Sequence, residues 1–285
     1  MSVVSLVLIG AGVLLAGLFL YWQLIIAEGV YLGSGVVTLL YDIAATRYDG
    51  IKQFDELNEA AFLGYPLTHA LSATPAPHVL DVGTGTARLP LALFEQPTFN
   101  GRVVALDASR RMLRIAAKKV APFAHRIDLL WMDAARLPFP DGTFDAVTCL
   151  EVLEFTPNPA GQLAELVRVL RPGGVLLTTR RRGFDARVMP GKTHPREAFI
   201  ALLTSLGLRG VQVNPWQMDY DLVWALRPGG PRPAMGGVRP LVEVLRCPAC
   251  QRVALQPEGT AFACGHCSAR FQRRAGVVEL RRRSG

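Results

Sequence analysis

An apolar strand that runs into a tight, glycine-containing turn constrains this chain more than any other feature of its sequence. Residues 79–82 are apolar except for Asp81, and Gly83, Thr84 and Gly85 follow directly. Because neither glycine carries a side chain, the turn can lie against a ligand and offer it main-chain N–H groups. The turn therefore predicts a ligand site at the end of a buried strand.

A second acidic residue supports this interpretation. Asp107 closes the next apolar stretch, residues 103–107, where a carboxylate can accept both hydroxyls of a ribose. Dinucleotide-binding proteins have a similar pair of motifs with a third glycine beside the pyrophosphate, whereas this chain has Ala87 after Thr86. A ligand without a pyrophosphate fits this difference.

Further motifs follow in order at residues 104–109, 131–139, 144–147 and 166–174. Together with the glycine turn they resemble the successive motifs of class I S-adenosylmethionine-dependent methyltransferases, and the resemblance extends over about residues 41–226. It implies an α/β, Rossmann-like fold with a doubly wound seven-stranded sheet. It also implies S-adenosylmethionine as the cofactor.

The resemblance assigns roles to individual residues. The glycine turn is expected to hold the methionine part of the cofactor, and Asp107 the ribose. Met112 is expected to cover one adenine face, and Asp133 with the Ala134 backbone to bind the adenine edge. The full set expected to bind the cofactor is Asp81, Gly83, Thr84, Gly85, Asp107, Ala108, Met112, Asp133, Ala134 and Leu150.

No residue is assigned as a catalytic base. Methyl transfer from a sulfonium needs an aligned acceptor, and alignment alone can lower a barrier by about 7–11 kcal/mol. Glu151 and Glu154 are candidates for orienting substrate or cofactor. Tyr48 is a candidate for lining the methyl path and Arg88 for pairing with the cofactor carboxylate, while packing or solvent-facing roles stay open for all four. Phe155 stands where many relatives have histidine, which argues against a histidine base there.

Alternating apolar strands and helical patterns predict a parallel sheet covered on both faces. Strands are expected at residues 79–82, 103–106, 127–132, 144–150 and 175–179, with two late strands near 211–213 and 221–225. By the resemblance, the last strand runs antiparallel. Before the first strand, a helix over residues 36–45 is expected to continue to about residue 57. By the same resemblance, this segment is expected to cover the cofactor.

The N-terminal residues 2–27 contain no charged side chain. A helix over residues 3–26 would be about 36 Å long, enough to cross a bilayer. The alternatives are a cleaved signal peptide, which requires a basic start and a small-residue cleavage site, and a buried helix. We predict a single-pass membrane anchor at residues 1–28. Basic residues lie only on its C-terminal side, which favours a cytoplasmic location for the rest of the chain.

Residues 228–240 are rich in proline and glycine and predict a linker. It separates the methyltransferase-like region, residues 29–227, from a C-terminal module, residues 241–285. The module resembles the small zinc ribbons that are attached to, or partner, RNA and protein methyltransferases.

Two CxxC pairs define this module. Cys247, Cys250, Cys264 and Cys267 can place four thiolates around Zn²⁺ at about 2.3 Å, and paired disulfides are the weaker alternative. A closed site of four cysteines has no open position for catalysis, so the zinc is predicted to be structural. Loss of Cys247 and Cys250 is therefore expected to leave cofactor affinity nearly unchanged.

The net charge of +8 allows anionic partners. The basic side chains of residues 110–119 fit the solvent-facing side of an amphipathic helix, so nucleic acid is allowed but not favoured as a partner. The leading function is a membrane-anchored methyltransferase for a lipid-type or membrane-associated acceptor, such as a quinone precursor. The alternatives are an RNA or protein methyltransferase that docks its target with the ribbon, and a non-catalytic cofactor-binding scaffold.

Overall fold

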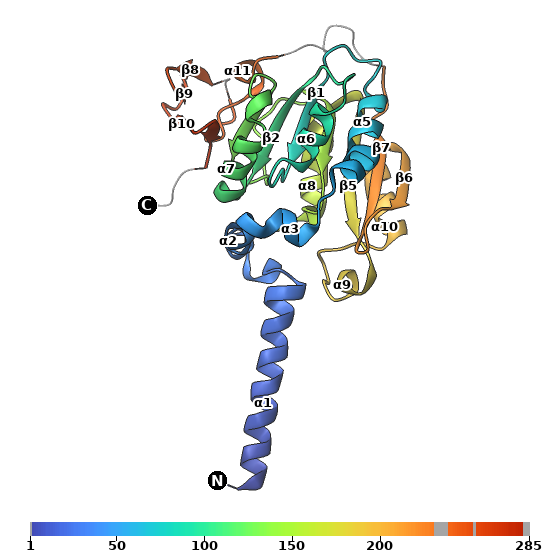
Figure 1. The fold of residues 1–285 in the computed structure, drawn as a ribbon, viewed down its shortest axis with the longest axis vertical. Coiled ribbons are helices and arrows are strands. Elements are labelled where there is room, and N and C mark those ends of the chain that lie inside the picture. The colour runs from blue at the N-terminus through green and yellow to red at the C-terminus, as the bar shows by residue number, and fades with distance from the viewer. Residues whose placement is uncertain (1, 231–238, 253–254, 282–285) are drawn as a thin grey trace.

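The computed structural model describes residues 2–230, 239–252 and 255–281. Figure 1 shows three parts in chain order: a long N-terminal helix, an α/β part, and a small C-terminal group of strands. Most of the expected linker, residues 231–238, lies outside the described residues.

All seven strands expected from the sequence are present. They are β1 (His78–Val82), β2 (Arg102–Asp107), β3 (Ile127–Trp131), β4 (Phe144–Cys149), β5 (Leu170–Arg181), β6 (Arg209–Pro215) and β7 (Tyr220–Leu226). Their spatial order is β6-β7-β5-β4-β1-β2-β3. Strands β1 to β5 pair in parallel, and β7 runs antiparallel to both β5 and β6. The strand order reverses between β1 and β4, where doubly wound sheets bind their ligands.

Helices cover both faces of the sheet because side chains alternate along each strand. Leu80 belongs to a core cluster that includes residues of α8 (Pro159–Val169) and α10 (Arg196–Ser205). Val79, which precedes Leu80 in β1, belongs to a second cluster that includes residues of α5 (Tyr65–Ala70), α6 (Arg88–Phe94) and α7 (Arg110–Lys119). The predicted two-sided burial is confirmed.

The segment before β1 is helical but interrupted. It consists of α2 (Ser34–Ala44), a 3₁₀ turn (Ala45–Arg47), α3 (Tyr48–Lys52), α4 (Glu56–Glu59) and a π-helical turn (Ala60–Gly64). The prediction of one continuous helix to about residue 57 is wrong, because Gln53 adopts a left-handed backbone with φ +50° and ends α3. This segment, which we call the cover, lies over the end of the sheet (Figure 1).

The N-terminal helix projects away from the α/β part (Figure 1). α1 (Val3–Tyr21) continues into a π-helical turn, Trp22–Ile26, and together they are long and apolar enough to cross a membrane. Its base is packed: Ala27 and Val30 form a buried cluster with Met189. The Trp22 indole also donates a hydrogen bond of 3.0 Å to the Val188 carbonyl.

The C-terminal strands extend the sheet. They comprise β8 (Gln256–Glu258), β9 (Ala261–Ala263), β10 (Arg270–Arg274) and β11 (Val277–Glu279), preceded by the short helix α11 (Leu241–Val244). β11 pairs in parallel with β3, with Val278 opposite Leu130, which gives one sheet of eleven strands. The ribbon also shares the core: Leu245, Phe271 and Leu280 belong to the same cluster as Leu80.

Candidate functional site

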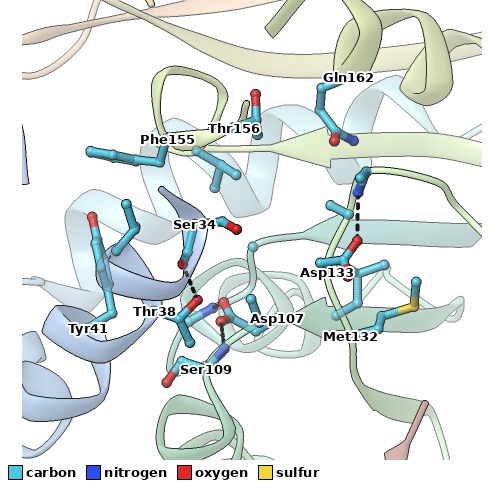
Figure 2. Close-up of a pocket in the computed structure, with 18 of the residues that line it drawn as sticks. Ser34, Thr38, Tyr41, Asp107, Ser109, Met132, Asp133, Phe155, Thr156 and Gln162 are labelled. Atoms are coloured by element: carbon cyan, nitrogen blue, oxygen red, sulfur yellow. Dashed lines mark hydrogen bonds between the residues drawn. The ribbon is translucent and has the colours of Figure 1, made fainter. Parts of the chain in front are cut away.

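A cavity of about 350 Å³ lies at the carboxyl ends of β1, β2, β3 and β4. Figure 2 shows Met132 and Asp133 on one side of it and Tyr41 and Phe155 on the other. The cavity therefore lies where the reversal of strand order leaves a crevice.

The glycine turn forms one wall of the cavity. The backbone N–H groups of Gly83 and Thr84 donate to the Leu106 carbonyl at 2.8 and 3.0 Å, which binds the turn to β2. Gly83 has φ +74°, and a Cβ there would lie 2.3 Å from a Val152 methyl group. A side chain at this position is excluded by both backbone and packing.

Asp107 lies between the turn and the next helix. One carboxylate oxygen accepts the Gly85 N–H at 2.8 Å, and the other accepts the Ser109 N–H at 2.7 Å. Burial raises the pKa of Asp107 to about 6, although these N–H donors act in the opposite direction. A carboxylate offers about four lone-pair positions, so Asp107 keeps acceptor capacity beyond these two bonds.

Asp81 lies in β1, two residues before Gly83. It accepts a hydrogen bond of 2.7 Å from the Thr148 hydroxyl, and burial raises its pKa to about 6. Asp81 and Thr84 line a smaller neighbouring pocket rather than the main cavity. Gly83 and Gly85 line both.

Of the other residues expected to bind the cofactor, some line the main cavity and one does not. Asp133, Ala134, Ala108 and Leu150 line the main cavity. Met112 is buried, and the cavity lining instead includes Met132, which the sequence analysis did not assign. Its place at the end of the expected third strand, residues 127–132, is the signal that could have identified it.

The opposite side of the cavity is aromatic. Tyr41 and Tyr48, from the cover, line it together with Phe155, and the Tyr41 and Phe155 rings meet edge to face at 5.8 Å. Burial raises the pKa of both tyrosines, so their phenols stay protonated. Glu154 is buried, accepts a hydrogen bond from the Tyr220 hydroxyl and does not line the cavity.

Arg88 and Glu151 belong to one network of ion pairs. Arg88 donates to Glu59 of α4 and, at 2.8 Å, to Glu151, which also accepts from Lys52 at 2.6 Å. Burial acts to raise the pKa of Glu151, but Lys52 and Arg88 hold it below its usual value. The Arg88 guanidinium lies 4.2 Å from the centre of the Phe54 ring. These contacts favour the packing role for Arg88.

Known proteins resemble this region in sequence. Residues 80–178 match the sequence profile of a family described as a methyltransferase domain. A demethylmenaquinone methyltransferase from Lysinibacillus sphaericus is 40% identical over 107 residues, which cover 38% of this chain and 45% of that protein. One from Clavibacter sepedonicus is 30% identical over 160 residues, or 53% of this chain and 64% of that protein.

The chain contains a methyltransferase domain. The chain spans about half the length of the curated relatives that it matches. Two solved structures share the fold. The cyclase SpnF has a TM-score of 0.55 at 18% identity and covers 70% of this chain and 98% of its own. A structure from Haloferax volcanii, of a complex with the methyltransferase activator Trm112, has a TM-score of 0.53 at 19% identity and covers 67% and 97%.

The four cysteines of the ribbon come together beside the methyltransferase domain. Their sulfur atoms all lie within 4.8 Å of one another. The Cys247 and Cys267 sulfurs are 3.6 Å apart, and those of Cys250 and Cys264 are 3.7 Å apart. Backbone N–H groups of Cys267 and His266 lower the pKa of Cys264 to about 6, which favours the thiolate that binds metals, whereas burial raises the pKa of Cys247. This donor set fits a tetrahedral Zn²⁺ site.

The basic helix α7 makes more intramolecular contacts than expected. Arg110 pairs with Glu279 of the ribbon, and Lys119 pairs with Asp49 of the cover. Two of the charges that the sequence placed on a solvent-facing side therefore join other parts of the chain to the methyltransferase domain.

Proposed function

We propose that this chain is an S-adenosylmethionine-dependent methyltransferase, held at a membrane by residues 1–28, that methylates a lipid-type acceptor of the quinone class. The observation that carries the proposal is the location of the cavity. It lies between the motif residues of the methyltransferase domain and an aromatic wall, and Phe155 of that wall packs against the cluster at the base of the apolar helix.

The cavity residues fit the cofactor. The unused acceptor capacity of Asp107 suits the two hydroxyls of a ribose. Asp133 and Ala134 are available to the adenine edge, and Gly85, which has φ +54°, presents only backbone to the cavity at the turn, where the methionine part would lie. The cofactor supplies an electrophilic methyl group when it is bound.

The residues of the cavity would act by orientation. The described lining contains protonated tyrosines and an ion-paired Glu151, which suit positioning better than proton abstraction. The cover and Phe155 would hold a flat apolar acceptor against the methyl group and exclude water. An electron-rich aromatic ring is an acceptor class that this wall suits, and it agrees with relatives named demethylmenaquinone methyltransferases.

The packed base of the helix supports retention of the N-terminal segment. Cleavage after Ala27 would remove both Trp22 and Ala27 from their contacts with residues 188–189. These contacts argue against a cleaved signal peptide. As an anchor, the helix would hold the cavity next to the bilayer. The charge distribution favours the cytoplasmic side for the methyltransferase domain.

The test is methyl transfer from labelled cofactor to fractionated acceptors. The full chain is reconstituted in vesicles and incubated with membrane lipids, RNA and protein from one extract, and each fraction is counted. We expect label in the lipid fraction, in a quinone-type product identified by mass. Asp107→Ala serves as the control that removes cofactor binding.

Two other results are informative. Label confined to RNA or protein would replace the lipid acceptor with the macromolecular alternative, in which the ribbon docks the target. Tight cofactor binding with no transfer to any fraction would favour the non-catalytic scaffold.

A further inference from the structure

One residue of the cavity wall comes from the C-terminal end of the described chain. Arg281 lies two residues after the end of β11 and is partly buried. It lines the same cavity as Asp107, Asp133 and Ala134. The ribbon therefore reaches the site that the methyltransferase motifs build.

The position of Arg281 is set by the sheet. The backbone N–H groups of Leu280 and Arg281 both donate to the Trp131 carbonyl, at 3.0 and 3.1 Å. Trp131 ends β3 and directly precedes the stretch that contains Asp133. The Trp131 indole donates to the Ala108 carbonyl at 2.9 Å. Arg281 is thus held beside two segments that the cofactor is expected to contact.

We propose that Arg281 is a cofactor-binding residue supplied by the ribbon, that it contacts the adenosine part of S-adenosylmethionine, and that the four-cysteine site thereby controls cofactor affinity. The proposal rests on the proposed function. A planar guanidinium can stack on an aromatic base or donate to its ring nitrogens. The carboxylates of Asp107 and Asp133 on the same wall favour a cation there.

The link to the cysteines runs through a shared core. Cys247 and Cys264 belong to the same buried cluster as Val278 and Leu280. β9 pairs with β10, and β10 pairs with β11, so the strand that precedes Arg281 is tied to the segments that contain the cysteines. Metal loss should therefore release this strand and displace Arg281, which would weaken cofactor binding. The sequence alone led to the opposite expectation, that cofactor affinity stays nearly unchanged.

The experiment measures binding of S-adenosylhomocysteine and S-adenosylmethionine to the full chain by calorimetry. Arg281→Ala should weaken both by about fivefold to tenfold, and Arg281→Lys should recover part of the loss because lysine keeps the charge without the planar group. Arg274→Ala, at an exposed position on β10, is the matched control and should bind like the unmodified chain. Thermal melting of each variant checks that the fold is intact.

The cysteine site is tested in the same assay. Cys247→Ser with Cys250→Ser should lower the zinc content and weaken cofactor binding at least as much as Arg281→Ala. Unchanged affinity in this double variant, with the zinc lost, would overturn the link between the ribbon and the cofactor.

The outcomes separate the two proposals. Unchanged affinity in Arg281→Ala, with a normal affinity in the unmodified chain, overturns the role of Arg281 and leaves the proposed function standing. An unmodified chain that binds neither ligand overturns the proposed function and this inference together.

Discussion

Asp107 shows how one side chain can serve both the fold and the site. Its two oxygens bind the N–H groups of Gly85 and Ser109, which fixes the glycine turn relative to α7. The same carboxylate lines the cavity. Its burial has a cost in solvation, which is seen in the raised pKa of about 6.

Asp107→Asn should weaken cofactor binding by about 10- to 100-fold, because charge-assisted hydrogen bonds to the ribose are lost. In the unmodified chain, affinity should also fall as the pH drops through about 6, where Asp107 gains a proton. Calorimetry from about pH 7.5 to about pH 5 checks both effects. The pH effect should shrink in the variant, and the remainder would report Asp81, whose pKa is also about 6.

Stability provides the control for this pH effect. For both acids the native state binds more protons than the unfolded chain between about pH 4 and pH 6, so their contribution to stability rises as the pH falls through that window. Acid should thus weaken cofactor binding without these two groups destabilising the fold. Affinity that stays constant down to about pH 5 would contradict the role of the Asp107 carboxylate.

Sequence reasoning at the residue scale succeeded where local backbone chemistry decides the outcome. Gly83 has to be glycine because of its own φ and the nearby Val152, and a strand-ending acid such as Asp107 follows from the strand pattern. Arg88 and Arg281 were different. Arg88 pairs with Glu59 and Glu151, and Arg281 lines a cavity formed mainly by residues distant in the chain. No local sequence pattern encodes these positions.

At the scale of elements, the cover is held in place by ion pairs rather than by a continuous helix. Lys52, at the end of α3, reaches Glu151 after β4, and Glu59 of α4 reaches Arg88 of α6. Both pairs are largely shielded from solvent. These pairs attach the cover at two points beside the cavity, in addition to the Lys119–Asp49 pair with α7.

Lys52→Met should release the first of these points. We expect the free energy of unfolding to fall by about 1.5–3 kcal/mol and cofactor dissociation to become severalfold faster, measured by denaturant titration and stopped-flow fluorescence. Lys118→Met, at an exposed position on α7, is the matched control. Equal dissociation rates in both variants would show that the Lys52 pair does not hold the cover closed.

The ribbon covers a sheet edge. Without β11, β3 would be the outer strand of the methyltransferase sheet, and an exposed edge strand is prone to pair with other chains. The sequence predicted the cysteine site from its spacing but not this pairing, because the three-residue strand Val277–Glu279 carries no signal that specifies its partner.

Zinc removal should therefore expose β3. Purified protein should contain about one zinc per chain. A strong chelator should unfold the ribbon and cause aggregation. Elemental analysis and light scattering provide the measurements, and re-addition of Zn²⁺ before aggregation should restore the scattering of the untreated protein. A chain that stays soluble and folded in chelator, with no zinc at purification, would exclude a structural metal.

At the scale of the whole molecule, packed side chains connect the base of the apolar helix to the cavity. The base of the helix packs on residues 188–189, and Phe155 joins this cluster to the cavity wall. Hydropathy predicted the helix itself. The packed base depends on contacts more than 150 residues apart in sequence, such as Trp22 with Val188, which hydropathy does not report.

The most direct test of membrane-held methyl transfer compares the full chain with a deletion of residues 2–17, which keeps the packed base. Both are given a quinone-type acceptor embedded in vesicles and a short-chain, water-soluble analogue, and initial rates of methyl transfer are measured. We predict that the deletion lowers the rate on the embedded acceptor by more than about tenfold, because the local concentration at the bilayer is lost, and leaves the rate on the analogue nearly unchanged. Equal rates of the two proteins on the embedded acceptor would contradict the proposed role of the helix.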